Sequence, residues 1–119
     1  MISKFAAATI IGVLLYLMLG PAPAVEGSAP GIDKLAHLLA FGTIAACVAT
    51  LIPRTRALIV CGITLLLGAV VEVIQGLIGR DASWLDFIFD GAGVAIFGLA
   101  VVIWRRGGLR SQLQRWAHR

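Results

Sequence analysis

Apolar residues occur along this chain in four long runs, separated by short polar stretches or by stretches rich in proline and glycine. The runs cover about residues 5–20, 35–52, 57–78 and 85–104. The last three fall in the range of roughly 17–25 residues that a helix needs to cross a bilayer, and none alternates as a membrane β-strand does. Because backbone groups inside a bilayer must be hydrogen-bonded within their own segment, each run is predicted to be a helix.

The first run has two interpretations. It is short for a membrane span, and Lys4, the apolar run and the small residues of 22–24 together resemble a secretory signal peptide. However, its apolar part is longer than the typical core of such a peptide, so we expect a retained helix. The fold prediction is therefore an all-α membrane protein, a bundle of four transmembrane helices in a single domain over residues 1–119.

Composition supports a membrane protein. Apolar residues make up 60% of the chain and charged residues 13%, where a soluble domain has roughly 45–50% and 25%, and the mean hydropathy is +0.97. These values exclude a disordered chain and argue against a soluble one. The net charge of +4 does not indicate nucleic-acid binding, because the basic residues lie at the ends of the apolar runs, as they do in membrane proteins.

The distribution of lysine and arginine predicts an orientation. With a cytoplasmic N-terminus, eight basic residues lie inside and only Lys34 and Arg80 lie outside. Both termini are therefore predicted to be cytoplasmic, in the inner membrane of a bacterium. In the basic tail 105–119, Leu109, Leu113 and Trp116 are spaced as on one helical face, which favours a short interfacial helix on an anionic leaflet. A plain topology-setting tail is the alternative.

Polar residues enter three of the runs, all at their outer ends. Spacings of three or four residues place the polar residues of each run on one helical face, and Gly93, just past the last of them, would let a neighbouring helix or a ligand approach closely. A charge in mid-span costs about 2.5–3.5 kcal/mol, and the acids outnumber their cationic partners. We therefore expect an outward-facing functional pocket, with an internal charge cluster that fixes the bundle as the alternative. The pocket residues are Asp33, Lys34, His37, Glu72, Gln75, Arg80, Asp86 and Asp90.

Other chemistry has little support in the sequence. Cys47 and Cys61 lie within apolar runs and are interpreted as packing residues. No Cys-x-x-Cys pair, Gly-rich phosphate loop or Gly-x-Ser-x-Gly motif is present, so we expect no metal site, no catalytic set and no cofactor. Among the acids, Glu72 is the deepest in its span and the strongest functional candidate.

The ordered polar residues resemble a family. Asp33-Lys34-x-x-His37-x-x-x-Phe41, then Glu72-x-x-Gln75, Arg80 and Asp86-x-x-x-Asp90-x-x-Gly93 are similar to the VanZ-like pattern D-K-x-x-H-x-x-x-[YF], E-x-x-Q, R and D-x-x-x-N-x-x-G. The resemblance covers about residues 33–98. It implies a small multi-pass membrane protein of a kind linked in some members to lowered susceptibility to lipoglycopeptides. Asp90 departs from the pattern, because a carboxylate accepts hydrogen bonds where the family's amide also donates them.

Three functions follow as hypotheses. The first is a non-enzymatic membrane protein whose outer pocket engages a lipid headgroup, a cell-envelope precursor or a glycopeptide-type ligand. The second is a small accessory subunit packed against a larger membrane complex. The third is a membrane-embedded hydrolase or transferase that uses His37 with Asp86 or Glu72 as acid and base, with Ser83 the outer-loop serine nearby. The expected partners are membrane lipids and, under the second hypothesis, a larger membrane protein complex.

Overall fold

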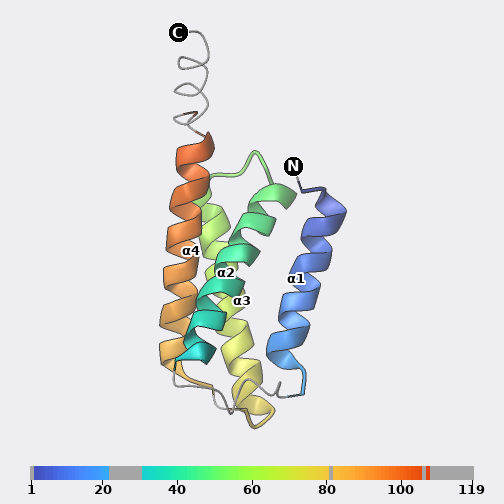
Figure 1. Cartoon of the computed structure of the whole chain (residues 1–119), viewed down its shortest axis with the longest axis vertical. Helices are drawn as coiled ribbons and strands as arrows, with labels where there is room; N and C mark the ends of the chain where they lie inside the picture. Colours follow the sequence, from blue (N-terminus) through green and yellow to red (C-terminus); the bar gives the residue numbers. More distant parts are fainter. Residues whose placement is uncertain (1, 22–30, 81, 106, 108–119) are drawn as a thin grey trace.

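The computed structural model describes residues 2–21, 31–80, 82–105 and 107, and in this part of the chain it is helical (Figure 1). Its helices are α1 (Lys4–Leu19), α2 (Ile32–Leu51), α3 (Ala57–Leu77) and α4 (Trp84–Arg105). The prediction of an all-α chain with four helices is confirmed. The helix ends lie within one residue of those predicted, except that α2 starts earlier, directly after Gly31. The predicted interfacial helix of the tail lies outside the described residues.

Three of the helices, α2, α3 and α4, are long and apolar enough to cross a membrane. α1 has 16 residues, which at about 1.5 Å per residue gives a length of about 24 Å, against a hydrocarbon core of about 30 Å. The length and apolar composition of α2, α3 and α4 thus indicate a membrane protein. That α1 also crosses the membrane stays a prediction.

The outer surface of the bundle is apolar. Side chains such as Phe5 and Leu58, each 84% exposed, and Leu77, 80% exposed, point away from the other helices. A soluble protein would rarely expose so many large apolar residues. In a bilayer, lipid chains would cover this apolar surface and keep it out of water, as the composition predicts.

α2 supplies most of the core. It contacts each of the other helices, and in Figure 1 it runs through the middle of the bundle. α1 packs against this core from one side through the partly buried Ile11, Leu14, Leu15, Met18 and Leu19. The core itself consists of Phe41, Ile44, Ala45, Val48 and Ala49 from α2, Val60 and Val71 from α3, and Val94 from α4.

The backbones of α2 and α4 approach each other closely at Gly93. A Cβ atom at this position would collide with the carbonyl oxygen of Leu38 and would lie 3.1 Å from the amide nitrogen of Gly42. Only glycine therefore allows this crossing. Of the two neighbours that the sequence left open for Gly93, the structure places a helix there. The crossing brings the second turns of α2 and α4, which carry His37 and Asp90, to the same level.

The turn between α3 and α4 is fixed by helix caps. Gly79 has φ of 78°, and the N–H groups of Gly79 and Arg80 donate to the carbonyls of Gly76 and Gln75, which is the Schellman pattern of a helix C-terminus. Ser83 Oγ then accepts from the N–H of Leu85 at 3.2 Å and caps the start of α4. The caps fix the residue at which α4 begins. They thereby fix how Asp86 and Asp90 are oriented relative to α3.

Candidate functional site

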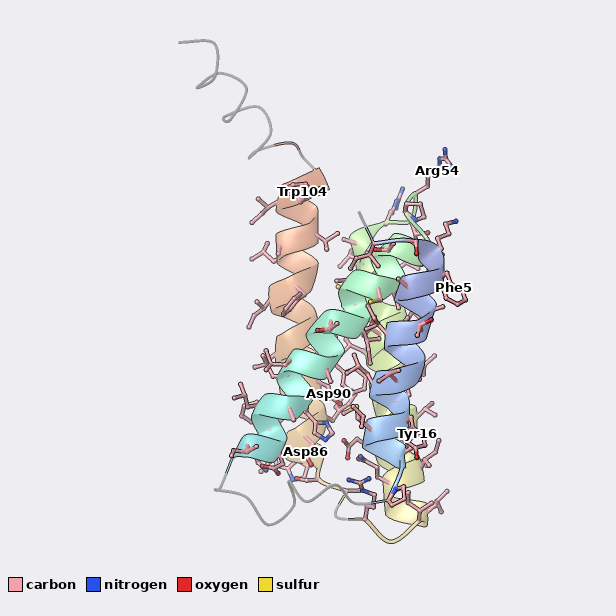
Figure 2. All side chains as sticks on the ribbon, turned by 45° about the vertical axis from the view of Figure 1, so that its right-hand side comes forward. Phe5, Tyr16, Arg54, Asp86, Asp90 and Trp104 are labelled. Atoms are coloured by element: carbon pink, nitrogen blue, oxygen red, sulfur yellow. The ribbon has the colours of Figure 1, made fainter. Side chains whose placement is uncertain are left out.

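The polar residues expected in the pocket lie at one end of the bundle. This is the end where α1 and α3 finish and α2 and α4 begin, shown at the bottom of Figure 1. Figure 2 shows Asp86 near this end and Asp90 about one turn further in, with Arg54 at the opposite end. The structure therefore places these acids at the end of the molecule opposite Arg54.

Three helices contribute one residue each to a buried group, which we call the buried triad: His37, Glu72 and Asp90. Nδ1 of His37 lies 2.8 Å from Oδ1 of Asp90, a hydrogen bond, and 3.8 Å from Oε1 of Glu72. The side chain of Asp90 is fully buried, and those of His37 and Glu72 are 11% and 13% exposed. The triad is thus held almost entirely inside the protein.

Two apolar neighbours shape the buried triad. The ring of Phe41, one turn along α2, stacks on the imidazole of His37 with their centroids 6.4 Å apart. On α3, a Cβ atom at Gly68 would lie 3.2 Å from Oδ2 of Asp90, so the missing side chain makes room for the carboxylate. Gly68 is not among the residues that the sequence predicts for the site. Its position four residues before Glu72, on the same helical face, was the signal available.

The carboxylates of the buried triad are incompletely paired. Among the described residues, no group donates a hydrogen bond to Oε1 or Oε2 of Glu72 or to Oδ2 of Asp90, and these atoms have almost no accessible surface. A buried polar atom without a partner costs free energy, and a buried unpaired charge costs more. Protons, water, a bound cation or a donor from outside the described residues would balance these oxygens.

A second group, the rim, lies nearer the end of the bundle and consists of Asp33, Lys34 and Asp86. Nζ of Lys34 lies 2.9 Å from Oδ2 of Asp33 and 3.5 Å from Oδ1 of Asp86. Asp33 is half exposed, whereas the side chain of Asp86 is only 7% exposed. With both groups counted, four carboxylates face one lysine and one histidine, so the site carries an excess of negative charge unless some acids are protonated.

The last two predicted residues hold the end of α1. Nε2 of Gln75 donates to the carbonyl of Met18 at 2.9 Å, and Nη1 of Arg80 donates to the carbonyl of Gly20 at 2.6 Å. The last carbonyls of a helix have no partner within the helix, and these two side chains supply one. The eight residues predicted as one pocket thus form three adjoining groups: the buried triad, the rim and this pair at the end of α1.

The serine considered for catalysis has a structural role in this arrangement. Ser83 Oγ accepts the hydrogen bond that caps α4. Among the described residues, no side chain that could act as a base is hydrogen-bonded to this hydroxyl. His37 instead faces the two carboxylates of the buried triad. The arrangement is therefore suited to binding a positively charged group.

Comparisons with protein-family models, with curated proteins and with solved structures find no match for this chain. The VanZ-like resemblance therefore stays a prediction from the polar residues. The geometry of the buried triad and the rim is the observation on which a function is inferred.

Proposed function

We propose that this chain is a non-enzymatic, VanZ-like integral membrane protein that binds an envelope ligand at the polar end of its bundle. The ligand is a lipid headgroup, a cell-envelope precursor or a glycopeptide-type molecule that carries a positively charged group. The observation that carries the proposal is the set of buried carboxylate oxygens, both of Glu72 and Oδ2 of Asp90, that have no hydrogen-bond donor among the described residues. A positive group from a ligand would offset the desolvation of these oxygens.

The rim favours a ligand that carries both signs of charge. Lys34 lies at the entrance, with 30% of its side chain exposed, and its ammonium group suits a phosphate or carboxylate. The acids further in suit an amine. A phosphoethanolamine headgroup combines both groups over a few bonds, which makes it a suitable test ligand.

The direction in which the site faces is part of the proposal. The described basic residues at the other end of the bundle are Lys4, Arg54 and Arg56, and the tail adds five more in the sequence. The positive-inside rule supports cytoplasmic termini in a bacterial inner membrane and a polar end that faces outward. In this orientation the site meets the outer leaflet and the envelope beyond it.

Lipid retention tests the proposal directly. The full chain is placed in nanodiscs that contain equal amounts of phosphatidylethanolamine and phosphatidylglycerol, and native mass spectrometry identifies the lipid that stays bound. We expect the wild type to retain the ethanolamine lipid at least about threefold over the glycerol lipid, roughly 0.65 kcal/mol, and Glu72→Gln to lose this preference. Thr64→Val is the matched control, because Thr64 lies two turns away on α3 and its hydroxyl bonds only its own helix. Equal retention by wild type and Glu72→Gln would reject an amine-binding site.

A cellular assay tests the envelope role. The chain and its Glu72→Gln and Glu72→Leu variants are expressed in a glycopeptide-sensitive bacterium, and susceptibility to teicoplanin is measured. We expect the wild type to lower susceptibility and both variants to lose the effect. If both variants act as the wild type in this assay and in the lipid assay, Glu72 has no functional role, and the accessory-subunit hypothesis replaces the proposal.

A further inference from the structure

The buried triad contains the donor types of a transition-metal site. It offers one imidazole nitrogen and the oxygens of two carboxylates, and one such atom from each residue lies within 4.8 Å of the others. We propose that His37, Glu72 and Asp90 bind one divalent transition-metal ion, with Zn²⁺ as the reference ion. The inference rests on the proposed function and alters one part of it: the ion, and not an amine of the ligand, takes the oxygens of Glu72 and Asp90, and the ligand reaches the ion through one of its own oxygens.

The distances in the triad are close to those around a bound ion. Zinc binds nitrogen and oxygen at about 2.0–2.2 Å, so neighbouring ligand atoms around it lie about 3–3.6 Å apart. The two distances from Nδ1 of His37, 2.8 Å to Asp90 and 3.8 Å to Glu72, fall just below and just above this range, and all three ligand atoms lie within 4.8 Å of one another. Side-chain adjustments of roughly 1 Å would therefore bring the three atoms to distances that zinc accepts.

A hydrogen bond between His37 and Asp90 explains only part of this arrangement. It accounts for Nδ1 and Oδ1, but both oxygens of Glu72 and Oδ2 of Asp90 then have no hydrogen-bond donor within the described part of the chain. A metal ion between the three side chains is coordinated by Glu72 and replaces the proton between His37 and Asp90. It also compensates two carboxylate charges at once, which a single amine does not.

The surroundings of the triad favour a transition metal over calcium or magnesium. Ca²⁺ takes six to eight oxygen ligands and Mg²⁺ prefers an oxygen octahedron rich in water, whereas this site has an imidazole and is enclosed by Phe41 and Gly68. Imidazole with carboxylates suits zinc and its neighbours. Three protein ligands leave a position for a water or for an oxygen of a bound ligand. Spacing in the sequence could not reveal this site, because each ligand comes from a different helix.

Metal titration of the full chain tests the inference. The protein is purified in detergent, stripped with a chelator and titrated with Zn²⁺ against a chromophoric competitor. In parallel, the visible absorption of bound Co²⁺ reports the ligand geometry. We expect one ion per wild-type chain and a loss of affinity of at least about 100-fold for Glu72→Gln, Asp90→Asn and His37→Gln, since even outer-shell changes cost 10–100-fold. Thr64→Val is the control, because Thr64 lies outside both the triad and the rim and its hydroxyl donates to the carbonyl of Val60 on the same helix. It should bind Zn²⁺ within about twofold of the wild type.

Several outcomes would overturn the inference. The inference is overturned if the wild type does not bind one ion per chain. It is also overturned if the triad variants bind Zn²⁺ with an affinity within about threefold of the wild type. Helix content and a single size-exclusion peak show whether each variant is folded. The three substitutions change three different side chains, so we expect at least one of these variants to fold. If no metal binds but Glu72→Gln loses its lipid preference, the metal site is rejected while the proposed function stands. If the metal binds but lipid retention and teicoplanin susceptibility do not depend on the triad, the proposed function is rejected instead.

Discussion

Asp90 shows how a single side chain can conflict with stability. It is fully buried, one of its oxygens accepts a hydrogen bond from the imidazole of His37, and the other lies against Gly68 without a donor. An ionised carboxylate in such a place is stabilised only in part by its neighbours, and removing the charge while keeping the hydrogen bond can increase stability. Natural proteins accept such a cost where a side chain has a function.

The first prediction at this scale concerns Asp90→Asn. The amide keeps an oxygen for the His37 N–H, carries no charge and no longer repels the carboxylate of Glu72. With a chelator present we expect the variant to be more stable than the wild type by about 1–3 kcal/mol, the order of the cost of an unsatisfied buried polar group. With Zn²⁺ present the order should reverse, because only the wild type gains binding free energy. Unfolding in mixed micelles measures both. Asp33→Asn should change the stability by no more than about 0.5 kcal/mol in either medium, and a variant less stable than the wild type with chelator would contradict the argument.

Residues on one helical face can still have different partners, and this limited what the sequence could show. Glu72 and Gln75 share a face of α3, which predicted a common pocket. In the structure Glu72 faces His37 of α2, whereas Gln75 reaches the end of α1. Three residues along a helix correspond to a rotation of about 300°, so the two side chains diverge by about 60°. This divergence is enough to face two different helices, and their order around the bundle cannot be read from one sequence.

At the scale of the elements, the pattern of apolar runs was sufficient to place the helices. The runs predict four helices almost to the residue, because each is bounded by proline, glycine or arginine-rich turns. The exception is α2, whose first turn includes Asp33 and Lys34. An acid in a first turn is favoured by the helix dipole, so hydrophobicity alone starts this helix too late. The extra turn places Lys34 beside Asp86.

The crossing of α2 and α4 gives a prediction for Gly93→Ala. The added methyl group would collide with the carbonyl of Leu38 on α2, and backbone cannot move aside as a flexible side chain can. We expect a loss of about 1–3 kcal/mol of stability, together with weaker Zn²⁺ binding, because His37 and Asp90 are forced apart.

Gly62→Ala is the control for this change. Gly62 lies on α3 with no atom within 4 Å of an added Cβ, and alanine in a helix is favoured by about 0.5–1 kcal/mol over glycine. The control should therefore unfold at or above the wild-type temperature. Equal stability of the two variants would show that the close crossing at Gly93 does not constrain the site.

On the scale of the whole molecule, charge is divided between two ends. The buried triad and the rim lie at the end where α2 and α4 begin, and Lys4, Arg54 and Arg56 lie at the other. The apolar surface between the ends suits the hydrocarbon core. This division could be predicted from the sequence because it depends only on the order of charges and apolar runs. Whether α1 crosses the membrane could not be predicted in the same way, because the length of its apolar run is close to the minimum for a membrane-spanning helix.

Cysteine accessibility measures both the orientation and the crossing by α1. Single cysteines replace Ile2, Gly27 and Ser111 in a chain whose Cys47 and Cys61 are changed to alanine, and a membrane-impermeant maleimide is added to intact cells. The positive-inside rule predicts that only Gly27→Cys is labelled from outside, and that Ile2→Cys and Ser111→Cys react after permeabilisation. If α1 does not cross, α2, α3 and α4 make an odd number of crossings, so Ile2→Cys becomes labelled from outside while Ser111→Cys stays protected. Labelling of Ser111→Cys in intact cells would reverse the orientation and place the buried triad toward the cytoplasm, where an envelope ligand could not reach it.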